Sequence, residues 1–290
     1  MNRRRKQSRT WARLKETVRR FRKNKLAMLG LIIFLIILFS GIFAEQIIPY
    51  KEAITTHASN RLQRPSAEHW LGTDGRGRDM FARIIHAAPT SLMIGFTVPL
   101  LALFVGGFLG ISCGYFGGTY DNIIMRIVDM ISALPGTLLA IVMVAVLGPN
   151  MINLIIALGV GRIAGTARLT RSVALNIAGQ EYIEAAKCGG ASDLRTIFTH
   201  ALPNASGTII VQTTMNISSV ILTASSLSFI GLGVQPPRPE WGAMLNDARE
   251  YFRAAPYLMI FPGIAILLTV VSINMIGDGL RDALDPKLKN

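Results

Sequence analysis

Polar side chains recur along one helical face of an otherwise apolar segment in the second half of the chain. They follow one another at intervals of four, three, four and three residues: Gln212, Asn216, Ser219, Thr223 and Ser226. These hydroxyl and amide groups donate and accept hydrogen bonds without carrying charge. The stripe could line a route for a polar solute such as a peptide, or it could hydrogen-bond neighbouring helices, and the pattern leaves both interpretations open.

A second polar segment, "EYIEAAKCGGASDLRTIFTHALPN" (181–204), separates two apolar stretches. Its first part predicts a helix with a face of mostly small residues, on which Tyr182, Ala185, Ala186 and Gly189 lie, while Glu184 lies on another face. Gly189-Gly190 would end this helix, and Pro203 would end a second one. The pattern predicts a helix, a sharp turn and a second helix. An ordinary amphipathic pair on a membrane surface is the alternative.

Catalytic and metal-binding patterns are missing from the sequence. There is no Gly-x-x-x-x-Gly-Lys-Ser/Thr loop, so we expect no ATP binding by this chain itself. No His-Glu-x-x-His pair, paired-cysteine metal site or Gly-x-Ser-x-Gly turn occurs, and the four histidines are dispersed. A membrane enzyme is therefore disfavoured. Arg126 and Asp129 are interpreted as a local ion pair.

The elements that must position these residues are membrane helices. Hydrophobic residues make up 51% of the chain and charged residues 16%, which is more apolar than an ordinary soluble domain. A bilayer core needs about 20 apolar helical residues per crossing. The candidate spans are 26–47, 91–116, 124–148, 151–170, 206–231 and 255–277. We expect an all-α polytopic membrane protein with six transmembrane helices.

The basic N-terminal segment orients these spans. Residues 1–25 contain twelve Lys or Arg and one acid, Glu16, and such a segment next to a span stays in the cytoplasm. A nucleic-acid patch is the disfavoured alternative. Counting crossings places both termini and residues 171–205 inside. The cysteines, Cys113 in a span and Cys188 inside, share no outer loop, so no disulfide is expected.

Two further patterns concern packing. Glycines at 106, 110, 114 and 118 form a small-residue face on which another helix, of this chain or of another subunit, could pack closely. Residues 241–252 form an amphipathic stripe after a proline-rich turn, and we expect this stripe to lie flat on the outer membrane surface.

The spacing of the inner segment resembles a known motif. Glu184-Ala185-Ala186, three residues, Gly190, nine residues and then His200-Ala201-Leu202-Pro203 looks like the EAA loop of permease subunits of bacterial ATP-binding-cassette (ABC) importers. "HWLGTDGRGRDMFARII" (69–85) and "SFIGLGVQPPRPEWGAML" (228–245) are similar to segments of the peptide-importer branch. The chain most closely resembles the C-type permease subunit of dipeptide, oligopeptide and nickel importers, although the general motif has an aliphatic residue where His200 stands.

The resemblance implies a type I ABC importer permease fold in the bacterial cytoplasmic (inner) membrane, with the EAA loop as a coupling helix. The implied partners are a second homologous permease subunit, two ATPase subunits that bind ATP and Mg, and an extracytoplasmic substrate-binding protein. The outer segment would meet that binding protein, and its candidate contacts are Arg76, Arg78 and Asp79. Dispersed methionines favour peptides over nickel as substrate.

The expected organisation along the chain follows from these interpretations. The parts are a basic tail 1–25, a first span 26–47, an extracytoplasmic segment 48–90, a five-helix core 91–280 with its coupling loop 180–204, and a cytoplasmic tail 281–290. A self-sufficient channel or secondary transporter is a remote alternative, because the two halves show no inverted repeat.

Overall fold

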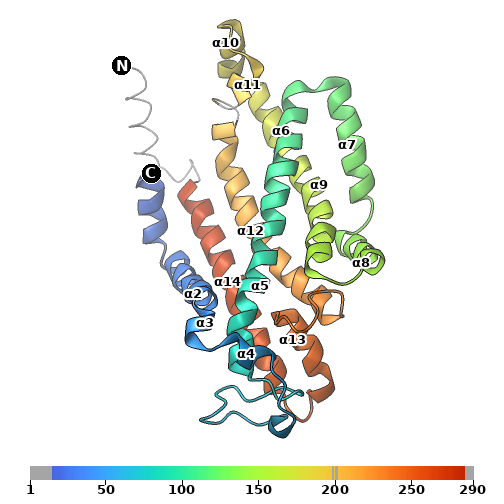
Figure 1. Ribbon diagram of the computed structural model, residues 1–290. Helices are drawn as coiled ribbons and strands as arrows, with labels where there is room; N and C mark the ends of the chain where they lie inside the picture. The colour runs from blue at the N-terminus through green and yellow to red at the C-terminus, as the bar shows by residue number, and fades with distance from the viewer. Residues whose placement is uncertain (1–14, 198, 200–201, 285–290) are drawn as a thin grey trace.

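The computed structural model describes residues 15–197, 199 and 202–284, and this part of the chain is helical with no β-strand. Figure 1 shows an elongated bundle. Its helices are α2 (Lys25–Ile42), α3 (Ala44–Ile47), α4 (Tyr50–Ile54), α5 (Met80–Leu101), a π-helical segment (Ala102–Gly106), α6 (Gly107–Phe116), α7 (Gly118–Ser132), α8 (Gly136–Leu147), α9 (Met151–Ala178), α10 (Glu181–Cys188), α11 (Asp193–Thr196), α12 (Leu202–Phe229), α13 (Trp241–Ala248) and α14 (Tyr257–Leu284).

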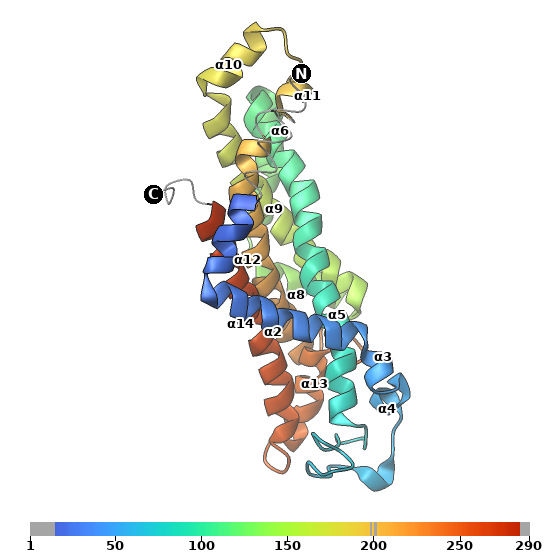
Figure 2. The same ribbon diagram turned by 90° about the vertical axis from the view of Figure 1, so that its left-hand side faces the viewer.

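The expected membrane architecture is confirmed. Within the described residues, five helical stretches are long and apolar enough to cross a bilayer: α2, the continuous stretch Met80–Phe116, α9, α12 and α14. A sixth crossing requires α7 and α8 to count as one bent span. In Figure 2, α2 runs across α5 and α14 at a steep angle.

The second membrane helix begins earlier than the hydropathy pattern predicts. It begins at Met80 rather than at 91, because the Asp79 side chain accepts a hydrogen bond from the Ala82 N–H at 2.8 Å and caps the helix. Arg83 and His86 lie in this first part of α5, and such polar residues lower the local hydropathy. Residues 80–90, placed in the outer segment by the sequence, are therefore helical.

The third expected span, 124–148, is bent rather than straight. Its two halves, α7 and α8, meet at an angle of 80°. The break falls just before Gly136, and Pro135 precedes α8 as its N-cap, where a proline cannot continue the hydrogen bonding of α7. Figure 1 shows that α7 begins at the end of the bundle where α9 finishes. The segment after α9 therefore lies at the end of the bundle where α7 begins, whether or not α7 and α8 together count as one membrane crossing.

The expected glycine face packs against a helix of this same chain. A Cβ at Gly110 would overlap Thr170 Oγ1 and the Ala167 carbonyl of α9, and a Cβ at Gly114 would lie 2.6 Å from the Ala174 Cβ. Gly106 makes a similar approach to α9, whereas a Cβ at Gly118 would meet nothing within 4 Å. Three of the four glycines therefore allow α6 and the π-helical segment before it to pack closely against α9.

The outer helix α13 does not present its apolar stripe to a membrane surface. Trp241, Met244 and Ala248 are 1%, 3% and 3% exposed and pack against α5 and α14. The expectation that this stripe lies flat on the outer surface is wrong, because protein rather than lipid covers it. Glu240 caps α13 by accepting hydrogen bonds from the N–H groups of Gly242 and Ala243. Burial raises the pKa of Glu240, and these two bonds oppose the rise.

Candidate functional site

The helix–turn–helix expected between α9 and α12 projects from one end of the bundle (Figures 1 and 2). Pro203 does not end its second helix as expected, because the described second helix, α11, is Asp193–Thr196 and Pro203 lies in the first turn of α12. Its first helix is α10, in which Tyr182, Glu184 and Ala185 are exposed and Ile183 is buried. Ile183 therefore holds the helix against the protein, while the other three side chains lie on its exposed surface.

A glycine turn follows α10, as the sequence predicts. Gly189 and Gly190 are exposed, and Gly190 has φ +77°, a left-handed conformation that favours glycine. After the turn, the Tyr115 hydroxyl of α6 donates a hydrogen bond to Asp193 Oδ1 of α11 at 2.7 Å. Ile197 is buried. The hydrogen bond to Asp193 and the burial of Ile197 thus fix the second half of the loop to the bundle. The side chains of Ala186 and Pro203, and residues His200 and Ala201, lie outside the described part.

The polar stripe lies on an open face of α12. Gln212, Ser219 and Ser226 are exposed, and Asn216 and Thr223 are partly exposed. Thr223 and Ser226 donate hydrogen bonds to carbonyls of their own helix, those of Ser219 and Leu222. No described helix covers the whole of this face, and exposed polar groups at membrane depth face water or a polar partner rather than lipid.

An arginine of α9 lies beside this stripe, and the sequence analysis did not place it there. Arg162 Nη2 donates to Ser219 Oγ at 2.7 Å, and Nη1 lies 3.5 Å from Asn216 Oδ1. The sequence does contain a signal for this position, because Arg162 interrupts an apolar run. Only the folded chain shows that it contacts two members of the stripe.

The other arginines near the inner half of α9 have acidic partners. Arg168 Nη2 lies 2.7 Å from Asp129 Oδ1, and the Arg171 guanidinium makes two hydrogen bonds to the Asp121 carboxylate. The interpretation of Arg126 and Asp129 as a local pair is wrong, because Asp129 pairs across helices with Arg168 instead.

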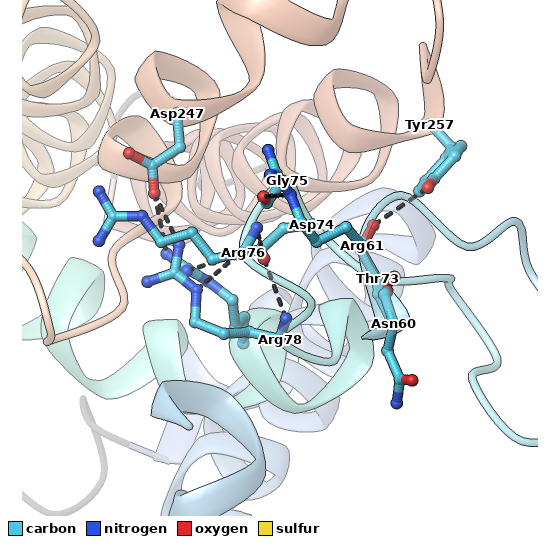
Figure 3. Close-up of polar contacts among 10 residues, drawn as sticks. Asn60, Arg61, Thr73, Asp74, Gly75, Arg76, Arg78, Asp247 and Tyr257 are labelled. Atoms are coloured by element: carbon cyan, nitrogen blue, oxygen red, sulfur yellow. Dashed lines mark hydrogen bonds and ion pairs between the residues drawn. The ribbon is translucent and has the colours of Figure 1, made fainter. Parts of the chain in front are cut away.

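The outer end of the bundle contains a buried charge cluster, drawn in Figure 3. Asp74 Oδ2 accepts hydrogen bonds from Arg78 Nε at 2.6 Å and from Arg83 Nη1 at 2.8 Å. Asp247 Oδ2 of α13 lies 3.0 Å from Arg78 Nη2 and 3.4 Å from Arg83 Nη2. The arginine side chains are 2% and 4% exposed. These four residues, the outer charge cluster, join the outer segment to α5 and α13.

This burial changes the roles expected for the outer residues. Arg78 and Asp79 are buried, and Asp79 caps α5 and lies 2.8 Å from His69 Nδ1. Both are placed to stabilise the outer segment rather than to contact a binding protein. Arg76 is exposed and stays a candidate. It lines a hollow together with Asp247, Glu250 and Tyr251. Burial raises the pKa of Asp247, and the charges of Arg78 and Arg76 oppose the rise.

The stripe can be tested by cysteine accessibility. Cysteines replacing Gln212, Ser219 and Ser226 should react with a small hydrophilic thiol reagent in the assembled complex. In a complex with the ATPase subunits that the sequence resemblance implies, their reactivity should change between nucleotide-free and ATP-bound states. Matched controls are Ser218 and Ser225 on the same helix, which are 4% and 5% exposed and should stay unreactive as cysteines. Protection of all three stripe positions in every state would remove α12 from any solute route.

A helical membrane bundle with an open polar face on one helix and a projecting helix pair at one end has the architecture of a membrane transport permease. Comparison with known proteins agrees. The family model described as "Binding-protein-dependent transport system inner membrane component" matches residues 106–290, and that described as "N-terminal TM domain of oligopeptide transport permease C" matches residues 12–65. The chain belongs to the binding-protein-dependent inner-membrane transport component family.

Similar proteins cover nearly the whole chain. A dipeptide transport system permease protein, DppC, of Alkalihalophilus pseudofirmus is 47% identical over 95% of this chain and 90% of its own length. The glutathione transport system permease protein GsiD of Pectobacterium atrosepticum is 44% identical over 95% of this chain and 92% of its own length. A di/tripeptide transport system permease protein, DppC, of Pseudomonas aeruginosa is 44% identical over 96% of this chain and 93% of its own length.

The fold is also that of a chain of a solved ABC transporter. A chain of the MetNI methionine ABC transporter, in an inward-facing conformation, is similar with a TM-score of 0.58 and 18% identity, over 71% of this chain and 98% of that chain. At this identity the likeness shows the fold alone. It confirms the permease fold expected from the sequence.

Proposed function

We propose that this chain forms half of the translocation path of an ATP-driven peptide importer, together with a second homologous permease subunit. The observation that carries the proposal is the open polar face of α12, because a peptide backbone needs hydrogen-bond donors and acceptors along its route. The relatives are named for dipeptide, di/tripeptide and glutathione transport, and this supports a peptide substrate rather than nickel.

The projecting α10 is the proposed docking site for one of two ATPase subunits. Tyr182, Glu184 and Ala185 are exposed there, and the Gly190 turn follows directly. ATP and Mg would bind to the ATPase subunits, and this chain would bind no cofactor. A short helix fixed to the bundle can transmit movement of a soluble subunit to α9 and α12, which flank it.

At the opposite end, the hollow beside the outer charge cluster is the proposed contact for an extracytoplasmic substrate-binding protein. Arg76 and Glu250 are exposed at this end of the molecule. The remaining part of the outer segment is held by buried ion pairs, so it offers a fixed surface rather than a mobile one.

The proposed orientation in the bacterial cytoplasmic membrane has both termini in the cytoplasm. In a background with Cys113 and Cys188 replaced by Ser, a cysteine at Ser66 should react with a membrane-impermeant reagent from outside intact cells. A cysteine at Ser192 should react only after the cells are opened. Both positions are exposed. Labelling of Ser192 from outside would contradict this orientation.

A deletion strain tests the substrate class. Loss of this subunit should abolish growth on a dipeptide as sole source of a required amino acid, and the intact gene should restore it. Nickel uptake, measured in the same strains, should not change. A loss of nickel uptake with normal growth on the dipeptide would favour the nickel alternative.

A further inference from the structure

Arg162 is a charged residue at membrane depth. It lies eleven residues into α9, which places it about 16 Å along the helix from Met151. The hydrocarbon core of a bilayer is about 30 Å thick. Ionisable residues at such depth are rare, and they usually lie at a substrate or ion path with an identifiable partner.

The partners of Arg162 are neutral, unlike those of the other two arginines of α9. Arg168 and Arg171 form ion pairs with Asp129 and Asp121. Across the described ranges, no carboxylate forms an ion pair with Arg162. Its two hydrogen bonds go to the Ser219 hydroxyl and the Asn216 side-chain carbonyl. The positive charge is therefore oriented by these groups but not neutralised by them.

The geometry leaves donors for a further group. A guanidinium has five N–H donors in a planar fork, and the two hydrogen bonds to α12 use one from each terminal nitrogen. The residues it contacts belong to the open polar stripe. A carboxylate is the group whose shape and charge match this fork, by two parallel hydrogen bonds.

We propose that Arg162 binds the α-carboxylate of the substrate as it passes along the polar face of α12, with Asn216 and Ser219 as positioning residues. The inference depends on the proposed peptide import. Dipeptides, tripeptides and glutathione all carry carboxylates, whatever their side chains. The Arg162 guanidinium can thus select substrates that have a free carboxylate, while it leaves the peptide side chains unrestricted.

The test uses the complete complex in proteoliposomes, with the binding protein saturated with labelled Ala-Phe or with its C-terminal amide. The measured quantity is the ratio of the acid uptake rate to the amide uptake rate. Dividing the ratio of a variant by that of the wild type cancels the preference of the binding protein. We expect Arg162→Gln to lower this ratio about tenfold, the effect of losing hydrogen bonds to a charged group. Arg162→Lys keeps the charge without the fork and should give an intermediate ratio.

Arg168→Gln is the matched control, because it removes an arginine of the same helix that already has an acidic partner. It should leave the acid-to-amide ratio at the wild-type value. An unchanged acid-to-amide ratio in Arg162→Gln would overturn the inference. This includes the outcome in which uptake of both peptides slows equally, which is expected if Arg162 instead pairs with an acidic residue of the second permease subunit. Absence of ATP-dependent Ala-Phe uptake by the wild type would instead contradict the proposed function.

Discussion

Replacing Asp74 by Ala should destabilise the purified protein by about 3–5 kcal/mol, the usual cost of removing one partner of a buried ion pair. Asp74 accepts hydrogen bonds from both Arg78 and Arg83, whose side chains are 2% and 4% exposed. The variant leaves two buried guanidinium groups with Asp247 as their remaining acidic partner. The change is measured by thermal unfolding in detergent, which is monitored as the loss of monodisperse protein.

The matched control is Asp247→Ala. Asp247 contacts the same two arginines, but its side chain is 31% exposed, so water can partly replace it. We expect a clearly smaller loss of stability than for Asp74→Ala. Equal effects of the two substitutions would show that burial of Asp74 is not what makes the cluster stabilising.

Replacing Gly190 by Val should uncouple ATP hydrolysis from transport. A Cβ at Gly190 would meet nothing within 4 Å, but the residue has φ +77°. The obstacle to valine is therefore the backbone conformation and not a lack of space. A non-glycine residue held in this region costs about 1–3 kcal/mol, and a β-branched residue is among the least tolerant. The turn would change, and α10 with it. We expect peptide uptake to fall about tenfold, with ATPase activity continuing and assembly retained.

Gly179→Val controls for the loss of a glycine in the same loop. Gly179 has φ −83° and also no neighbour within 4 Å, so valine fits there without left-handed strain. Its uptake and ATPase activity should stay coupled. Glu184→Lys, which reverses a charge on exposed α10, should also reduce coupling. Normal uptake per ATP hydrolysed in Gly190→Val would remove the turn from the coupling mechanism.

Features determined by local sequence were predicted well. The apolar runs identified the membrane helices, and the glycine interval at Gly106, Gly110 and Gly114 identified a packing face. Gly190 was expected to end a helix and does so. Each of these depends on residues within a few turns of one another, where helix periodicity and glycine conformation decide the outcome.

Contacts between distant segments could not be predicted in this way. Asp247 meets Arg78 and Arg83, and Arg162 meets Ser219, only because segments far apart in the sequence pack side by side. The ion pair expected between Arg126 and Asp129 was wrong for the same reason, since α9 brings Arg168 to Asp129. The start of α5 at Met80 was missed because buried Arg83 lies within the helix, where its ion pairs compensate for its polarity.

Peptide import by this subunit is tested most directly by uptake of a labelled dipeptide into proteoliposomes that contain it with the proposed second permease and ATPase subunits. We expect accumulation against a gradient only when ATP is inside and the loaded binding protein is outside, and none when this subunit is omitted. Equilibration of the dipeptide without ATP would indicate a channel and contradict the account, as would ATP-driven accumulation that does not require this chain.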